Sequence, residues 1–156
     1  MGSAAELTEE ELVAWGERVG AAVEVPAVFA LRGDLGAGKS TLARAIARGA
    51  GVEGPVPSPT FNLLFRYETA RAAVHHLDLY RLERPDDVWE LGWAELGGGP
   101  ELVLIEWPER ADTHLPSPRW EVRLEELGDP GRRRVELAPV GEPPALPPLP
   151  ADGGAP

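Results

Sequence analysis

Residues 33–40 read GDLGAGKS, which matches the phosphate-loop pattern G-x-x-x-x-G-K-[ST]. Such a loop needs glycines because its backbone wraps around a phosphate with several N–H groups directed inward, in conformations that other residues avoid. Lys39 is expected to bridge the β- and γ-phosphates of a nucleoside triphosphate, and the Ser40 hydroxyl to bind Mg²⁺. The residues expected to hold the nucleotide are Gly36, Ala37, Gly38, Lys39, Ser40 and Thr41.

The sequence on either side of this loop fits the same interpretation. The short apolar run AVFALR precedes it at 27–32, and Leu42, Ala45, Ile46 and Gly49 follow it with a helical period. Strand, glycine-rich loop and helix are therefore expected in succession. The positive end of the helix dipole would then face the phosphates.

Lysine occurs only once in this chain. Lys39 is the single lysine among fifteen basic residues, and all the others are arginine. A compact ammonium suits a phosphate loop better than a planar guanidinium does, so its position indicates a function.

The segments before and after this unit predict further regular elements. Residues 7–23 have the period of an amphipathic helix, with Thr8 and Glu11 in capping-box positions. The strand-like segments 61–67 and 73–82 are separated by the polar sequence ETAR, which is typical of a hairpin.

The second half of the chain predicts a helix, a strand and another hairpin. The segment 84–96 begins with Pro and two Asp, a good helix start, and 101–107 is an apolar run that suits a strand buried on both faces. The segments 119–127 and 132–140 flank GDPG and predict an edge hairpin. We therefore predict a single-domain α/β fold, a P-loop NTPase-like mixed β-sheet flanked by helices.

Composition indicates where the folded domain ends. The chain has 156 residues, of which 43% are hydrophobic, enough for one sizeable core. Residues 140–156 are dense in Pro, Gly and Ala and have no aromatic side chain, so we expect a Pro/Gly-rich disordered tail there. Residues 1–139 are assigned to one P-loop ATPase domain.

Charge and cysteine content exclude several classes of function. The net charge of −11 disfavours tight, independent nucleic-acid binding, and the run RRR at 132–134 is interpreted as a solvated strand edge. Without cysteine there is neither a disulfide framework nor a thiolate metal site. The N-terminus is acidic and no apolar run approaches the roughly 20 residues of a membrane span, so a cytoplasmic protein is expected.

Two acidic residues are candidates for the magnesium site. In phosphate-loop proteins the metal usually takes a carboxylate at the end of a neighbouring apolar strand, directly or through water. Glu106 closes the run LVLIE, and Asp78 lies within HHLDLY. At least one of the two is expected to serve the metal, and Glu106 has the clearer apolar strand before it.

Other polar residues have weaker signals. The motif SPTF at 58–61 lies where P-loop GTPases place a segment that senses the γ-phosphate. It is either a plain turn or a segment in which Thr60 contacts the metal or the attacking water. His75 and His76 would point to opposite faces of one strand, which excludes a shared metal site. Packing or surface roles are favoured for both, and His76 is the better functional candidate because it shares a face with Asp78. Trp107 follows Glu106 directly and could border a nucleotide or a partner.

Four motifs in this order resemble the TsaE family, also called YjeE, a bacterial ATPase family needed for threonylcarbamoyladenosine in tRNA. They are GDLGAGKST, SPTF, HLDLYRL and IEWPER, and the likeness spans roughly Thr8 to Val135. The resemblance implies a P-loop ATPase that uses Mg-ATP and acts with TsaD and TsaB homologues, which transfer the threonylcarbamoyl group to the adenosine beside the anticodon. It implies hydrolysis that depends on these partners, and contact with tRNA only through their complex.

The resemblance also implies roles for individual residues. Lys39 would bind phosphate, Ser40 and Glu106 would bind Mg²⁺, and Asp78 would be a catalytic or metal-shell acid. The catalytic set would thus contain Asp78, Glu106 and the switch residue Thr60. Thr8 would approach the nucleotide base. Phe61 stands where tyrosine is common in the family.

Two other functions remain open from the sequence. A small-molecule kinase would use the same loop, but the segment after Glu106 shows no evident lid helix with arginine. A nucleotide-controlled binding module would change shape with ATP while hydrolysis is incidental. ATP itself is preferred over GTP from the resemblance, and no guanine-reading N-K-x-D motif is present.

Overall fold

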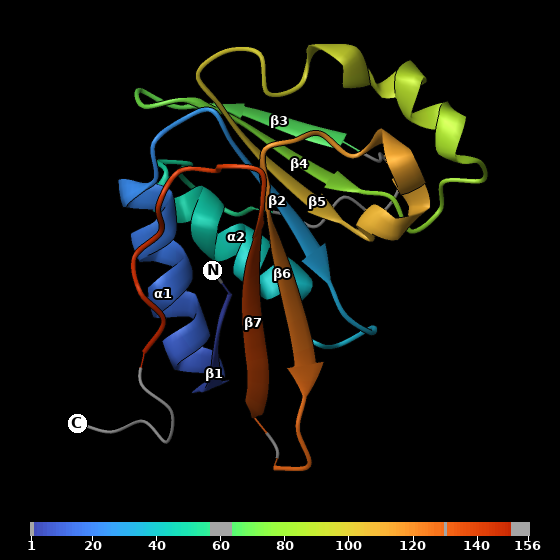
Figure 1. Ribbon diagram of the computed structural model, residues 1–156. Coiled ribbons are helices and arrows are strands. Elements are labelled where there is room, and N and C mark those ends of the chain that lie inside the picture. The colour runs from blue at the N-terminus through green and yellow to red at the C-terminus, as the bar shows by residue number, and fades with distance from the viewer. Residues whose placement is uncertain (1, 57–63, 130, 151–156) are drawn as a thin grey trace.

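The computed structural model describes residues 2–56, 64–129 and 131–150. These residues form one mixed sheet of seven strands in the order β1-β7-β6-β2-β5-β4-β3 (Figure 1). The strands are β1 (Ser3–Thr8), β2 (Ala27–Arg32), β3 (Leu64–Glu68), β4 (Ala73–Asp78), β5 (Glu101–Glu106), β6 (Arg119–Glu126) and β7 (Arg132–Val140). The predicted single-domain α/β fold with a mixed sheet flanked by helices is confirmed.

The centre of the sheet is parallel and its two sides are antiparallel. Strand β2 pairs in parallel with both β5 and β6, and β4 pairs in parallel with β5. Outside them, β3 lies antiparallel to β4, β7 to β6, and β1 to β7. Because parallel strands point the same way, the carboxyl ends of β2, β4 and β5 lie side by side at one end of the sheet.

Helices and short 3₁₀ segments cover the two faces of this sheet. Helices α1 (Glu9–Ala22) and α2 (Lys39–Gly49) pack on one face (Figure 1). The 3₁₀ segments η1 (Pro85–Leu91), η2 (Trp93–Glu95) and η3 (Pro108–His114) contribute to a second apolar cluster on the other face. No helix in the described part of the chain is long and apolar enough to cross a membrane.

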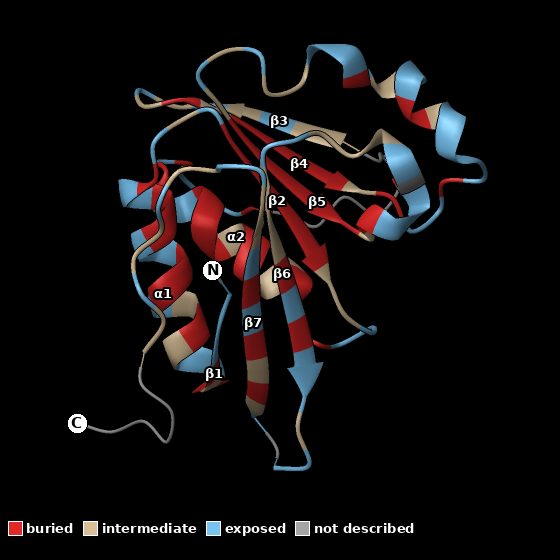
Figure 2. Cartoon of the chain, viewed as in Figure 1, coloured by how far each residue is buried: buried red, intermediate tan, exposed pale blue. Residues whose placement is uncertain are grey.

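The central strands are buried on both faces, as their unbroken apolar sequences predict. In β2, Phe29 belongs to the cluster under the helices and Val28 to the cluster under the 3₁₀ segments. In β5, Leu104 and Val103 divide in the same way. Both strands are buried along nearly their whole length (Figure 2). The core therefore encloses β2, which leads to the phosphate loop, and β5, which ends at Glu106.

Helix α1 fixes the position of α2, the helix that begins inside the phosphate loop. Its capping box is present, because Thr8 Oγ1 accepts the Glu11 N–H at 3.1 Å and Glu11 Oε1 accepts the Thr8 N–H at 2.8 Å. Glycines allow the two helices to approach closely: a Cβ on Gly20 would lie 1.9 Å from the Ile46 carbonyl oxygen. Any larger residue at Gly20 would push α2 away from its position.

The predicted edge hairpin is wrong in one respect, because β6 and β7 lie inside the sheet. The unpredicted strand β1 pairs with β7 along its whole length, from Ser3 opposite Leu137 to Thr8 opposite Arg132. The sequence SAAELT of β1 has no aromatic residue and only one β-branched residue, Thr8, so it lacks the composition typical of strands. Its pairing with a segment more than a hundred residues later was therefore not visible in local sequence.

The other predicted elements are present with altered bounds. The first hairpin is confirmed as β3 and β4, although residues 61–63 lie outside the described part. The helix predicted for 84–96 is instead two 3₁₀ segments, because Gly92 adopts φ 75° and interrupts it. The strand predicted at 101–107 ends at Glu106, since Trp107 turns to φ 57°.

Residues 141–150 differ from the disorder expected from their composition. They run beside α1 (Figure 1), where Trp15 Nε1 donates to the Pro147 carbonyl oxygen at 3.0 Å. Trp120 Nε1 donates to the Pro144 carbonyl oxygen at 2.7 Å, and Leu146 packs against the core. Composition alone could not reveal these partners, because both indoles come from distant parts of the chain. Proline also has little backbone entropy to lose on docking.

Candidate nucleotide-binding site

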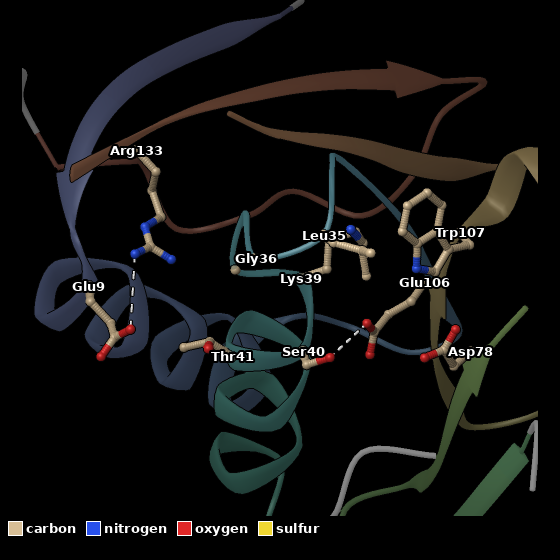
Figure 3. A pocket seen from close by; sticks show the side chains of 11 residues that line it. Glu9, Leu35, Gly36, Lys39, Ser40, Thr41, Asp78, Glu106, Trp107 and Arg133 are labelled. Carbon is tan, nitrogen blue, oxygen red and sulfur yellow. Dashed lines mark hydrogen bonds and ion pairs between the residues drawn. The ribbon is translucent and has the colours of Figure 1, made fainter. Parts of the chain in front are cut away.

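A cavity of about 230 Å³ opens beside the carboxyl ends of β2, β4 and β5. Figure 3 shows the phosphate loop at its centre, with Glu106, Asp78 and Trp107 on one side and Glu9 and Arg133 on the other. The residues that line it are Glu9, Leu35, Gly36, Gly38, Lys39, Ser40, Thr41, Asp78, Glu106, Trp107 and Arg133. Sequence-predicted residues from three separate segments thus meet in one place.

The glycines of the loop have the conformations that the motif requires. Gly38 adopts φ 111°, and a Cβ there would lie 2.4 Å from Nη1 of Arg133. Gly33 adopts φ 148°, and a Cβ there would lie 2.4 Å from the Leu124 carbonyl oxygen. Helix α2 begins immediately afterwards at Lys39. Its first N–H groups have no partner within the helix and are available to an anion.

Ala37 is the predicted loop residue that does not line the cavity. Its side chain is buried, and it borders a second hollow of about 400 Å³ behind the loop, beside Leu124 and Glu126. Its contribution to the site is made by the backbone: the Ala37 N–H donates to the Asp34 carbonyl at 3.1 Å.

The Lys39 ammonium closes the loop on itself. It donates to the carbonyl oxygens of Gly33 and, at 2.9 Å, of Asp34. It also lies 4.1 Å from the centroid of the Trp107 ring, within the range of a cation–π contact. Burial lowers the pKa of Lys39, and the nearby carboxylate of Glu106 opposes that shift. These contacts hold a positive charge beside the cavity.

The two candidate acids lie side by side but have different contacts. Strands β4 and β5 place Asp78 directly opposite Glu106. Glu106 is buried, and its Oε1 accepts the Ser40 hydroxyl hydrogen at 2.8 Å. Asp78 Oδ1 accepts the Tyr80 N–H at 3.0 Å. The acid that contacts the expected metal ligand Ser40 is therefore Glu106.

Asp78 is set up differently from an ordinary surface carboxylate. Burial raises the pKa of Asp78, the Tyr80 N–H lowers it, and the negative charge of Glu106 raises it further. A carboxylate whose proton affinity is increased in a cavity is a candidate for accepting a proton from a substrate or water.

Arg133 is a site residue that the sequence does not predict, because the run at 132–134 has the pattern of a solvated strand edge. Arg133 is 8% exposed, and its Nη1 donates to the Ala37 carbonyl at 3.4 Å. Nη2 lies 3.9 Å from Oε1 of Glu9. The strand's alternation was the available signal, since it puts Arg133 on the same face as Val135 and Leu137.

Trp107 lines the cavity in a strained conformation. It is the one residue other than glycine in the described chain with positive φ, at 57°. Such a conformation is uncommon for a bulky side chain and clusters at functional sites. The turn directs the indole over Lys39, and the Tyr80 ring packs against it with centroids 4.9 Å apart.

Among the described residues, Thr8 is, with Ala37, a predicted site residue that does not line the cavity. Thr8 forms the N-cap of α1, and its neighbour Glu9 lines the cavity in its place. Thr60, with the rest of SPTF at 58–61, lies outside the described residues. Its role stays a prediction from the motif.

Of the two histidines, the sequence favours His76 as the functional candidate, while packing or surface roles are expected for both. The structure brings its Nε2 to 2.6 Å from Glu106 Oε2, so it contacts a site residue directly. His75 points to the opposite face, with Nε2 2.9 Å from Glu101 Oε2. The predicted alternation of the two side chains is therefore confirmed.

The chain is similar to known proteins along most of its length. The family described as "Threonylcarbamoyl adenosine biosynthesis protein TsaE" matches residues 7–135. The "tRNA threonylcarbamoyladenosine biosynthesis protein TsaE" of Nostoc sp. is 38% identical over 135 residues, 84% of this chain and 82% of that protein. The protein of the same name from Treponema pallidum is 35% identical over 129 residues, 83% of this chain and 94% of that one.

A solved structure has the same arrangement. The crystal structure of Bacillus subtilis YdiB aligns with a TM-score of 0.73 and 28% identity. The alignment covers 90% of this chain and 88% of that one.

Proposed function

The chain belongs to the TsaE family, and from this membership and the geometry of the cavity we propose that it binds and hydrolyses Mg-ATP. Relatives in the family are named for the biosynthesis of threonylcarbamoyladenosine in tRNA. The hydrolysis would support transfer of the threonylcarbamoyl group to the tRNA adenosine beside the anticodon. It would do so by acting on a complex of TsaB and TsaD homologues.

One observation carries the proposal: the Ser40 hydroxyl of the phosphate loop donates to Glu106 at the end of β5. A hydroxyl that donates its hydrogen to a carboxylate still has its oxygen lone pairs available to bind a cation. In magnesium nucleotide sites, a loop hydroxyl and a strand-end carboxylate act together in this way. This hydrogen bond is not expected if the loop and the acid have unrelated roles.

The residues of the cavity suit a triphosphate. The backbone N–H groups after Gly36 and the start of α2 offer donors and a positive dipole end to phosphate oxygens. The Lys39 ammonium needs only to exchange the carbonyls of Gly33 and Asp34 for phosphate oxygens. Arg133 brings a second positive charge from the opposite side of the loop.

The donor atoms also suit magnesium. Ser40 and Glu106 supply oxygen, the ligand type that magnesium prefers. No group of three or more His, Asp or Glu residues that could hold a metal ion is present in the described part of the chain. Phosphate oxygens and water would therefore complete the coordination, as is usual for magnesium bound with a nucleotide. The bound ion would neutralise charge that develops on the transferring phosphoryl group.

We propose that Asp78 acts on the attacking water. Its raised pKa and its position beside Glu106 suit a group that orients a water molecule and accepts its proton. Thr60 is proposed to assist as the γ-phosphate sensor that the SPTF motif predicts. Positioning and charge neutralisation would supply most of the rate acceleration.

The proposed dependence on partner proteins is supported by surface properties. The net charge of −11 makes independent binding to tRNA unfavourable. Two large apolar side chains are exposed near the cavity, Leu35 at 70% and Tyr80 at 42%. We propose that these two side chains make apolar contacts with the partner proteins.

The test is phosphate release from ATP, measured with and without the TsaB–TsaD complex. We expect slow release alone, stimulation by the complex, and loss of the stimulated rate in Lys39→Ala. A Lys39→Ala variant as active as the wild type would show that hydrolysis does not occur at this loop. Transfer of phosphate to a small acceptor, without free phosphate, would identify a kinase instead.

A further inference from the structure

His76 on β4 lies behind the proposed magnesium ligands. Its imidazole is fully buried, with Nε2 2.6 Å from Oε2 of Glu106. The other oxygen of that carboxylate, Oε1, accepts the hydroxyl hydrogen of Ser40 at 2.8 Å. Side chains from β4, β5 and α2 thus form one chain of hydrogen bonds that ends in the phosphate loop.

The direction of the first bond follows from chemistry. A carboxylate that serves a magnesium ion is ionised and has only acceptor atoms, so Nε2 of His76 must carry the hydrogen and donate it. The other ring nitrogen, Nδ1, is buried without a hydrogen-bond partner among the described residues. The only hydrogen bond of the His76 ring in the described structure is therefore the one to Glu106.

This bond limits how the Glu106 carboxylate can turn. Glu106 is 2% exposed, so water cannot replace a lost partner at little cost. With Oε2 held by His76, Oε1 faces Ser40 and receives its hydrogen. The lone pairs of the Ser40 oxygen are then directed away from Glu106, toward the cavity. Residues that hold metal-binding carboxylates in this way commonly change metal affinity when they are removed.

We infer that His76 is a positioning residue of the proposed magnesium site. It orients Glu106, and through Glu106 the Ser40 hydroxyl, without touching the nucleotide itself. The inference rests on the proposed function, because it assumes that Ser40 and Glu106 serve Mg²⁺.

His75 provides a matched control in the same strand. It is also buried, its Nε2 lies 2.9 Å from a glutamate oxygen, and its Nδ1 also has no partner among the described residues. Its partner, however, is Glu101 at the start of β5, whose other oxygen accepts the Gly97 N–H at 2.8 Å. The two histidines thus have the same kind of pair at opposite ends of β5, and only one pair reaches the phosphate loop.

The experiment measures binding of a fluorescent ADP analogue over a range of Mg²⁺ concentrations and in EDTA. His76→Phe keeps an aromatic ring and removes the donor. It is expected to raise the Mg²⁺ concentration for half-maximal binding about 10- to 100-fold. Affinity in EDTA should stay within about two-fold of wild type. His76→Gln, whose amide can donate from a similar position, should recover part of the loss, and His75→Phe should change neither quantity.

Two results of this binding experiment would overturn the inference: a His76→Phe variant with the wild-type Mg²⁺ requirement, or a His75→Phe variant shifted as much as His76→Phe. Ser40→Ala separates this inference from the proposed function. If Ser40→Ala leaves the Mg²⁺ requirement unchanged, the magnesium site itself is wrong. If Ser40→Ala raises it and His76→Phe does not, only the role of His76 is wrong.

A measurement on the unchanged protein guards against a variant that does not fold. Nitrogen NMR of the histidine rings reports which nitrogen carries the hydrogen. We expect Nε2 of His76 to be protonated. An unprotonated Nε2 could not donate to Glu106 and would overturn the inference without any substitution.

Discussion

The parallel centre of the sheet and its antiparallel β1–β7 side contribute to the cavity in different ways. Strands β2, β4 and β5 deliver the loop, Asp78 and Glu106 at their ends, where parallel topology brings them together. The antiparallel side contributes Arg133 from one face of β7, a strand whose outer edge pairs with β1. Residues at the carboxyl ends of adjacent parallel strands lie close together because of the strand order. A residue on the face of a strand reaches a site only if the elements that pack against that face bring the site to it.

The largest expected effect tests the parallel centre. Glu106→Gln keeps the size of the side chain and removes its charge, so the Ser40 hydroxyl and the proposed magnesium ion lose their carboxylate. We expect partner-stimulated phosphate release to fall by at least about 100-fold. Glu101→Gln, on the same strand but away from the cavity, should retain the wild-type rate. Equal losses in both variants would mean that β5 acts through stability and not through chemistry.

The next effect tests whether the antiparallel side contributes directly to binding. Arg133→Met preserves the buried aliphatic stem and removes the guanidinium. ATP affinity, measured by calorimetry, should weaken about 10-fold, as expected for one charge-assisted hydrogen bond. Arg134→Met removes a charge from the opposite face of β7 and should bind ATP normally. If the two variants bind ATP equally well, the antiparallel side serves only as a support.

A smaller effect separates stability from binding on the antiparallel side. Truncation after Val140 removes the hydrogen bonds from Trp15 and Trp120 and the packing of Leu146 and Leu149. Thermal unfolding should shift down by about 5–10 °C, while ATP affinity stays within about two-fold. Truncation after Pro150 keeps all these contacts and is the control. An unchanged Tm after the longer truncation would show that residues 141–150 add no stability.

The smallest expected effect concerns Asp78 in the parallel centre and depends on pH. The raised pKa of Asp78 means that the folded chain binds its proton more tightly than the unfolded chain, so the ionised carboxylate costs stability at neutral pH. Asp78→Asn should therefore raise Tm at pH 7, by about 2 °C or less because the side chain is partly exposed. The gain should vanish as the pH falls through the raised pKa toward about 4. A gain that stays constant with pH would have another cause than charge.

The sequence predicted most of the parallel centre because its signals are local. The motif at 33–40 requires a strand before it and a helix after it, and the apolar run ending in Glu106 indicates a buried strand. Alternation along a strand also placed His76 on the face of Asp78. Alternation could not reveal that His76 contacts Glu106, because the local sequence of neither strand shows that β4 and β5 are neighbours in the sheet.

The antiparallel side was predicted less well because its structure depends on distant partners. The run at 132–134 has the sequence of a solvated edge strand, although in the structure β1 pairs with it. The sequence of β1 itself is a weak strand signal. Residues 141–150 are too poor in apolar surface to order alone. They are held by indole donors from α1 and β6, which lie far from them in the chain.

The sequence by itself therefore determined the phosphate loop, the acids at the strand ends and the family, because each depends on residue types at short spacings. Only the tertiary structure decided that Glu106 is the acid that contacts Ser40, that His76 supports it, and that Arg133 faces the loop. The physical reason is that a hydrogen bond requires a particular distance and direction. Those quantities are set by strand order and by covering elements, not by the local sequence of either partner.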